Sequence, residues 1–417
     1  MHHRVRGAIL GTIAALFVPS VAAADDKVKG AAPSAKDPAP PAEPAEGEPA
    51  TTEPPAPPES GTLAKPADAT ETPMTISEPQ FTWQPFGYLR LQYRAVRNDP
   101  NVAFVGRDDG FELQNARLGV RGSLGVRIKY TFAIDGAVDE RAQINVPEGK
   151  LRVGLRDAYA DVGVSGAFAV RGGFFETLVD PDLDVDTQRE FVDRPIESRG
   201  VRATQGYQTQ GLPPGRSLGA ALRLDPETPR SGDSPRFGFE LAVQNGADEY
   251  ASNNDNDTPA ASASVFARLP NNGWVVASAR FNRRTDGELP FRRDEDDLQG
   301  SFGARINAGP VGVSAGAIVV RTMFPTTGGP VENAYGAHGQ LTVRVEGTHP
   351  LTFGYRFGIL DPSSLFLTDR VIEHTAGAVI GVPALHMRFQ LQLVHVQEQA
   401  ARSLTNDRAQ LAAELSL

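Results

Sequence analysis

Basic side chains recur at every second position along several short segments of this chain, and they are its residues best suited to binding an anion. Within residues 111–135, Arg117 and Arg121 alternate with apolar residues before a glycine-containing turn, and Arg127 and Lys129 do so after it. A guanidinium recognises phosphate through a bidentate fork of N–H donors. Cations on one face of a sheet could therefore form an anion path. The candidates are Arg90, Arg94, Arg117, Arg121, Arg127, Lys129 and Arg171.

The elements that carry these cations have the alternation of β-strands. From Val126 to Asp135, apolar and polar residues follow one another with period two, and the Gly122–Gly125 stretch before them is short enough for a hairpin turn. About sixteen such segments follow one another between residues 81 and 417. Most have the length of a transmembrane strand, about 9–11 residues, whereas strands of soluble proteins average about 5–6.

A closed barrel is the expected arrangement of so many long strands. Closure removes unpaired edges, and in lipid it is the sheet that satisfies every backbone group. The sequence therefore predicts an all-β fold, a transmembrane antiparallel β-barrel of about 16 strands. A barrel of this size encloses water, which agrees with the Arg, Lys, Gln, Asn, Thr, Ser and Gly residues at the inward positions.

The connections between the segments alternate in length. Short turns are expected after every second strand and longer polar loops between them, with 226–235 as a longer exception among the turns. Short periplasmic turns and long external loops are typical of outer-membrane barrels. Both chain ends then lie on the periplasmic side.

Two regions of other composition precede the barrel. Residues 1–24 combine a basic start, an apolar run and small residues at a cleavage site, which predicts a secretory signal peptide. Residues 25–80 are dominated by Pro, Ala and Glu and predict a disordered periplasmic linker. The linker holds eleven acidic and four basic residues, and so most of the formal net charge of −10. The expected domains are thus 1–24, 25–80 and 81–417.

Several kinds of site are not expected. The chain has no cysteine, which excludes disulfides and thiol chemistry. A hydrolytic site needs a nucleophile beside a base. His386 and His395 fall on opposite faces of one predicted strand, and His338, His349 and His374 have no evident Ser or Asp companion. We expect no enzyme activity, metal, cofactor or nucleic-acid partner.

Several motifs resemble the phosphate-selective porin O and P family. They are the runs Gly110–Gly122, Leu155–Tyr159, Val170–Glu176, Arg189–Pro195 and Arg199–Val201, and the resemblance covers about Phe86–Val201. It implies a sixteen-stranded homotrimeric channel in the bacterial outer membrane that passes anions such as phosphate along lumenal arginines.

The longest connection, Phe175–Gly215, occupies the place in the strand order where general porins fold a loop inward, so it is expected to narrow the pore. This loop is rich in acids, and acids in a narrow pore repel phosphate. The expected constriction residues are Asp182, Asp184, Asp186, Arg189, Glu190, Asp193 and Arg194.

The chain departs from the family pattern at two other places. Gln114 and Asn115 stand where the family usually carries extra basic residues, and the chain ends in Leu417 rather than in an aromatic residue. The sequence leaves four alternatives open: an anion path, a charge-balanced lining with Asp135, Asp157 and Asp161, a specific uptake channel for organic anions or sugars, and a barrel that only anchors a periplasmic tail.

Overall fold

Sixteen strands of the described residues close into one antiparallel barrel. The computed structural model describes residues 81–417 except 107–108, 137–152, 166, 185–186, 188, 203, 225–235, 247–253, 255–257, 287–292, 326–327 and 400–402. The expected signal peptide and linker, residues 1–80, lie outside the described residues. Each strand pairs with its neighbour along the chain, and β1 pairs with β18 to close the sheet. The predicted fold class and strand number are confirmed.

The barrel strands are β1 (Phe81–Val96), β2 (Gly110–Leu124), β3 (Ile128–Asp135), β4 (Gly154–Ser165), β5 (Phe168–Glu176), β8 (Arg216–Leu224), β9 (Arg236–Gln244), β10 (Ala260–Leu269), β11 (Gly273–Asp286), β12 (Arg293–Ala308), β13 (Val311–Met323), β14 (Glu332–Val345), β15 (Leu351–Asp361), β16 (Val371–Val382), β17 (Met387–Glu398) and β18 (Arg408–Ser416). The helix α1 (Ile196–Arg199) and the small β6–β7 sheet (Gly200–Val201 and Thr209–Gln210) lie between β5 and β8, and the 3-10 turn η3 (Pro383–Leu385) precedes β17. Among the described residues, no helix is long and apolar enough to cross a membrane.

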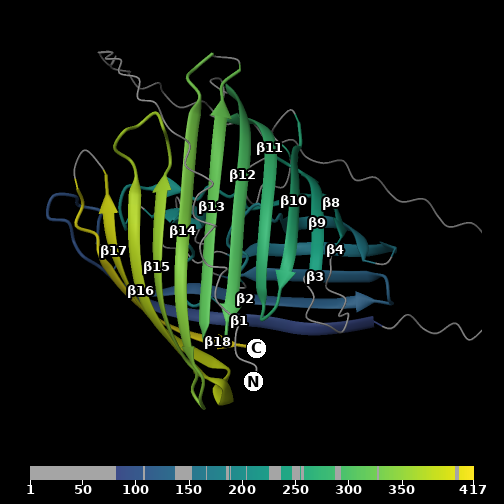
Figure 1. Cartoon of the computed structure of the whole chain (residues 1–417), viewed down its shortest axis with the longest axis horizontal. Coiled ribbons are helices and arrows are strands. Elements are labelled where there is room, and N and C mark those ends of the chain that lie inside the picture. The colour runs from purple at the N-terminus through teal and green to yellow at the C-terminus, as the bar shows by residue number, and fades with distance from the viewer. Residues whose placement is uncertain are drawn as a thin grey trace, which may run out of the picture. The chain divides into compact units, whose positions relative to one another are not determined.

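The barrel strands are strongly tilted, and Figure 1 shows the front strands β11–β15 crossing the strands β1–β4 behind them. A tilt of this kind accompanies closure of a sheet into a barrel. The long connections gather at one end of the strands and the short turns at the other, as the sequence predicts. The exception predicted at 226–235 lies outside the described residues.

The apolar face of the sheet points outward. On β17, Phe389, Leu391 and Leu393 are 39–54% exposed, whereas Gln390 and Gln392 between them are 1% exposed. The period-two alternation of a strand produces this difference, because successive side chains lie on opposite faces. An apolar exterior around a polar interior is the arrangement of a barrel surrounded by lipid.

The first hairpin turn lies three residues later than predicted. Gly122 and Ser123 are still paired on β2, where the backbone N–H of Ser123 donates to Thr82 Oγ1 at 2.9 Å. The chain reverses at Gly125–Arg127, and Gly125 supplies the left-handed φ of 60° that the turn requires. Arg127 therefore lies in the turn and not on the strand to which its alternation assigned it.

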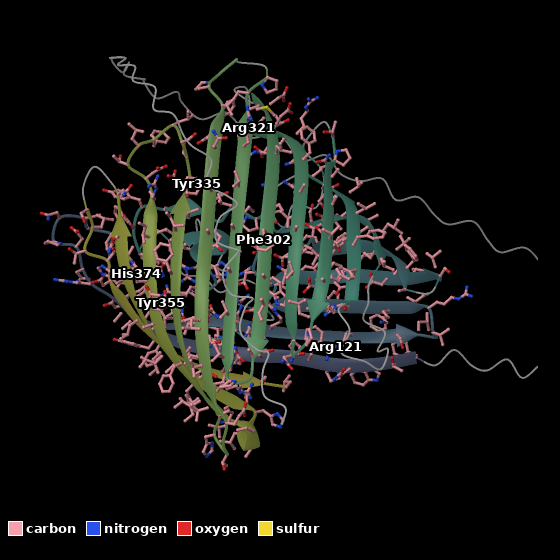
Figure 2. The ribbon with its side chains drawn as sticks, in the orientation of Figure 1. Arg121, Phe302, Arg321, Tyr335, Tyr355 and His374 are labelled. Atoms are coloured by element: carbon pink, nitrogen blue, oxygen red, sulfur yellow. The ribbon has the colours of Figure 1, made fainter. Side chains whose placement is uncertain are left out.

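An arginine at Phe302 tests the lipid-facing assignment. Phe302 lies outward at mid-height on β12, while Arg321 lies near the end of β13 that joins the long connections (Figure 2). A charge at the bilayer midplane costs about 2–4 kcal/mol, but about 0–1 kcal/mol near the interfaces. We expect Phe302→Arg to reduce the free energy of unfolding in lipid vesicles much more than Ile306→Arg does. Ile306 lies on the same face of the strand but closer to the short turns. Equal effects would contradict the assignment.

Candidate functional site: the lumen wall and the connection folded against it

The connection between β5 and β8, residues 177–215, lies against the inward face of the barrel wall. The backbone N–H of Val192 donates to Gln392 Oε1 at 2.9 Å, and Arg388 Nη1 donates to the carbonyl oxygen of Arg189 at 2.7 Å. Gln114 Nε2 donates to the carbonyl oxygen of Val192 at 3.0 Å from another part of the wall. The connection is thus bound to strands that are far apart in sequence.

Buried ion pairs fix the connection in place. Arg199 Nη2 lies 2.6 Å from a carboxylate oxygen of Glu373 on β16. Arg408 on β18 contacts both Glu373 at 2.8 Å and Asp193 of the connection at 3.4 Å. On the other side, Arg305 of β12 contacts Asp184 at 2.7 Å. Because the side chains of Arg199, Glu373 and Arg408 are only 2–4% exposed, removing one partner would leave an uncompensated buried charge.

A small apolar cluster adds to these contacts. Ile196 and Val201 of the connection pack in one buried cluster with wall residues of β15, β16 and β17. The wall members are Leu360, Val371, Val394 and Val396. This cluster is the reason that inward positions near the long-connection ends of these strands are apolar and not polar.

Glycines on the inward face let the connection approach the wall closely. A Cβ at Gly336 would lie 2.3 Å from Glu197 Cβ, and one at Gly377 would lie 2.9 Å from the ring of Phe191. Gly354 approaches the same ring at 2.8 Å. Phe191 is 1% exposed, and the Arg356 guanidinium lies 4.7 Å from the centre of its ring. The glycines therefore form a seat for the connection.

The acids of the connection differ in their titration because their neighbours differ. Burial opposes ionisation of Asp193, but the charges of Arg199, Arg408, Arg94 and Arg202 outweigh it and lower its pKa. Burial likewise opposes ionisation of Asp182, and Arg189 and Arg194 lower its pKa nonetheless. For Asp184, burial and the nearby Asp182 charge raise the pKa in spite of Arg305. The first two carboxylates are thus held firmly in the charged form.

Four of the predicted anion-binding cations are paired with carboxylates. Arg90 Nε donates to Glu414 Oε2 at 2.8 Å, and Arg94 lies 3.0 Å from Glu112. The next two pairs repeat the arrangement on neighbouring strands. They are Arg117 with Asp135 at 3.4 Å and Arg171 with Asp161 at 2.8 Å.

The other three predicted cations are exposed and lie toward the short-turn end. Arg121 Nε donates to Gln84 Oε1 at 3.3 Å, and its guanidinium lies 5.6 Å from the centre of the Phe86 ring. Lys129 pairs with Ser123 across the first hairpin. Arg127 lies in the turn itself. The cations predicted to form one anion path therefore lie in two different environments, one paired with carboxylates and one exposed near the short turns.

The predicted constriction residues also form pairs, so the acids of the connection do not present an unbalanced negative surface. Asp182 lies 3.1 Å from Arg189, and Arg194 forms an ion pair with Asp180. Glu190 forms an ion pair with Arg305 of the wall. Asp186 lies outside the described residues.

Important partners of the connection were not among the site residues predicted from the sequence. Arg305, Arg356, Arg388 and Arg408 on β12, β15, β17 and β18 all contact it. The same period-two rule would have placed them inward. The same rule also places the glycines Gly336, Gly354 and Gly377 on the inward face, where they leave room for the connection.

Aromatic rings beside the lumenal arginines were also missed. The guanidinium groups of Arg90 and Arg117 lie 5.2 and 5.1 Å from the centre of the Tyr88 ring, and that of Arg171 lies 3.8 Å from the centre of the Tyr159 ring. Cation–π contacts of this kind fix the direction of a guanidinium.

Two histidines have a partner or a position that the sequence did not indicate. His338, for which no companion was evident, is buried against Glu197 of α1. His386 lies in the turn after η3 with a φ of 52°, and not on the following strand. Among the described residues, no group of three or more His, Asp or Glu side chains is placed to hold a metal ion.

Comparison with known families and proteins gives a consistent result. Residues 87–211 match the family model of phosphate-selective porin O and P, close to the range suggested by the sequence motifs. No sequence among curated proteins matches.

Solved outer-membrane proteins share the fold at low sequence identity. The anion-selective porin from Comamonas acidovorans is 16% identical, with 81% of this chain and 100% of that chain covered and a TM-score of 0.57. The outer membrane channel DcaP of Acinetobacter baumannii is 11% identical, with 81% and 97% covered and a TM-score of 0.54. The trimer form of OmpT of Vibrio cholerae is 11% identical, with 81% and 99% covered and a TM-score of 0.54.

A larger side chain at Gly336 should release the connection from its seat. In Gly336→Val the new methyl groups would overlap Glu197, and overpacking of this kind costs about 1–3 kcal/mol. We expect trypsin to cleave after Arg189 or Arg199 in the folded variant but not in the original protein. Gly339→Val on the same strand is the matched control, because a Cβ there meets nothing within 4 Å. Equal resistance of both variants would refute the seat.

The lowered pKa of Asp193 predicts how stability depends on pH. The ordinary value is 3.8, and the value in the folded protein is lower, so the stabilisation is fully present above pH 3.8 and is lost only as the pH falls through the lower value. We expect Asp193→Asn to reduce thermal stability equally at about pH 7 and about pH 5. The difference between the variant and the original protein should shrink only in stronger acid. A difference that vanished already near about pH 5 would contradict this assignment.

Proposed function

We propose that this chain, an outer-membrane channel for small solutes whose residues 87–211 match phosphate-selective porin O and P, passes small hydrophilic solutes by diffusion with a preference for small anions such as phosphate. The observation that carries the proposal is the connection 177–215, bound to several parts of the lumen wall by its ion pairs and hydrogen bonds.

The solute path runs along the wall strands β4 and β5. Charged side chains beneath the connection, such as Arg90, Glu373 and Arg408, are only 2–4% exposed. In contrast, Asp161 and Glu176 on β4 and β5 are 18% and 23% exposed. Side chains that retain contact with water mark the side of the lumen open to solutes.

The anion preference is modest because most lumenal charges cancel. Arg171 and Asp161 form a two-point ion pair with both N–H···O distances at 2.8 Å, which neutralises the two charges locally. Arg121 differs, since among the described residues its partners are the amide of Gln84 and the ring of Phe86 rather than a carboxylate. A surplus of positive charge at such positions favours anions through a wet pore. The fold shared with an anion-selective porin adds support.

The assembly and orientation form part of the same proposal. We place the long connections outside and both ends of the barrel, with the linker 25–80, in the periplasm, because short turns in outer-membrane barrels are periplasmic. A homotrimer is proposed from the fold shared with OmpT, which is described in a trimer form. Residues 1–24 act as the export signal in this proposal.

Ion selectivity in planar bilayers tests the proposal. We expect the purified protein to conduct and to give an anion-selective reversal potential in a salt gradient. The double variant Arg117→Ala and Arg121→Ala should lower the ratio of anion to cation permeability severalfold, since it removes two cations and leaves Asp135 without its arginine. Arg127→Ala is the matched control and should leave this ratio unchanged, because Arg127 lies in the turn.

Two outcomes would overturn parts of the proposal. A protein that folds and inserts but does not conduct would favour the barrel as an anchor for the periplasmic tail. Cation selectivity of the original protein would refute the anion preference and leave the channel itself intact.

A further inference from the structure

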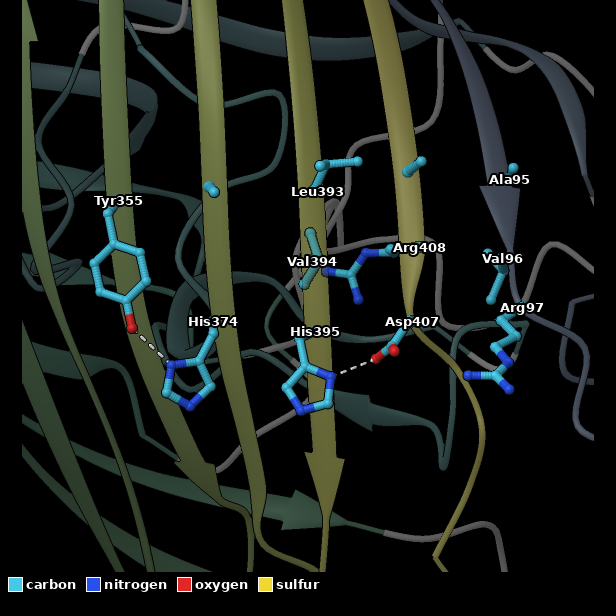
Figure 3. Close-up of a pocket in the computed structure, with 12 residues that line it drawn as sticks. Ala95, Val96, Arg97, Tyr355, His374, Leu393, Val394, His395, Asp407 and Arg408 are labelled. Atoms are coloured by element: carbon cyan, nitrogen blue, oxygen red, sulfur yellow. Dashed lines mark hydrogen bonds and ion pairs between the residues drawn. The ribbon is translucent and has the colours of Figure 1, made fainter.

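A hollow with polar groups beside an apolar lining lies in the outer surface where β15, β16, β17, β18 and β1 lie side by side. It measures about 600 Å³, and we call it the outer hollow (Figure 3). Its members that matter here are Ala95, Arg97, Ala376, Ala409, His374 and His395. His374 and His395 are direct cross-strand partners on β16 and β17 and lie on the same outward face as Leu391 and Leu393.

The two imidazoles are held by hydrogen bonds at their Nδ1 atoms. His374 Nδ1 lies 2.7 Å from the Tyr355 hydroxyl, and His395 Nδ1 lies 2.8 Å from Asp407 Oδ1. The rings stack with their centres 6.2 Å apart, as Figure 3 shows them side by side on the outer face. Asp407 Oδ1 also accepts the backbone N–H of Val396 at 3.1 Å.

Arg97 supplies a positive charge at the rim, where Asp407 also lines the hollow. Its backbone N–H donates to the carbonyl oxygen of Asp407 at 2.7 Å, which holds the residue beside the hollow. Within the part of the chain that the structure describes, its guanidinium has no hydrogen bond or ion pair. This separates Arg97 from the lumenal arginines described above, which contact carboxylates, amides or aromatic rings.

The floor of the hollow is apolar because small residues replace large ones. Ala95, Ala376 and Ala409 stand on the outward face where the neighbouring positions carry residues such as Leu393 and Leu411. A recess of this kind in a lipid-facing wall accommodates part of an acyl chain. The polar groups lie above it, since Arg97 directly follows β1 and Asp407 directly precedes β18.

We propose that the outer hollow binds an anionic phospholipid, whose headgroup carries a net negative charge, with the phosphate at Arg97 and the two histidines and an acyl chain over the alanines. A guanidinium forms charge-assisted, bidentate hydrogen bonds with phosphate, and basic pockets on membrane proteins bind lipid headgroups in this way. The position in the outer leaflet rests on the orientation proposed above. A second copy of this chain is the less suitable occupant, because a dry subunit interface would bury the unpaired Arg97 charge.

Lipid binding to the purified full-length protein tests the assignment. The protein in detergent is titrated with phosphatidylglycerol and, separately, with zwitterionic phosphatidylcholine, and bound lipid is counted by native mass spectrometry. We expect tight binding of phosphatidylglycerol only, and about tenfold weaker binding to Arg97→Ala. The combined change His374→Ala and His395→Ala should weaken binding further.

Three controls decide between the possible outcomes. Arg344→Ala, an exposed arginine at the short-turn end that pairs with Glu346, should leave lipid binding unchanged. Inorganic phosphate should compete poorly, and equal binding of free phosphate would refute a lipid as the ligand. Arg97→Ala should conduct like the original protein, so a failure of the channel proposal is seen separately in the bilayer.

The oligomeric state of the same variants tests whether a second copy of this chain occupies the outer hollow instead of a lipid. If Arg97→Ala dissociates the oligomer, or if both lipids bind with equal affinity, the proposal is overturned and the hollow belongs to a subunit contact or to nonspecific lipid contact.

Discussion

In the core of a bilayer no water is available to a backbone N–H or C=O group, so these groups must pair with one another. The pairing of β1 with β18 meets this requirement because it closes the sheet. Closure joins the first and last strands of a domain more than 300 residues long, and every barrel strand then has two neighbours. It also decides the sidedness of the sheet. The apolar side chains turn toward lipid, and the polar ones are left to line a water-filled interior.

The interior that closure creates is then shaped by the connection 177–215. Glycines on β14, β15 and β16 allow it to approach the wall, and Phe191 and Ile196 occupy the space that they leave. Buried ion pairs such as Arg199 with Glu373 hold it there. The arrangement combines close apolar packing with paired charges, so the acids that look repulsive in the sequence serve mainly to attach the connection.

The same pairing explains the weak selectivity proposed for the channel. An arginine beside a carboxylate contributes little net field, whereas Arg121 beside Gln84 and Phe86 retains its charge. On the outside, Arg97 is the counterpart, a cation beside an apolar recess at the edge of the lipid. In both proposals, for the lumen and for the outer surface, the functional residues are cations that have no carboxylate as a direct partner.

The sequence by itself determined the all-β fold, the alternation of long and short connections and the inward positions of residues such as Arg90 and Arg171, because period-two patterning and connection length are local properties of the chain. Its errors were also local, at Arg127 and His386, where positive-φ turns shift the boundary of a strand. Only the tertiary structure decided which acid meets which arginine. Glu414 reaches Arg90 because closure brings β18 beside β1, and Asp193 reaches Arg408 because the connection folds inward. Such contacts depend on closure and on loop packing, and no short-range pattern encodes them.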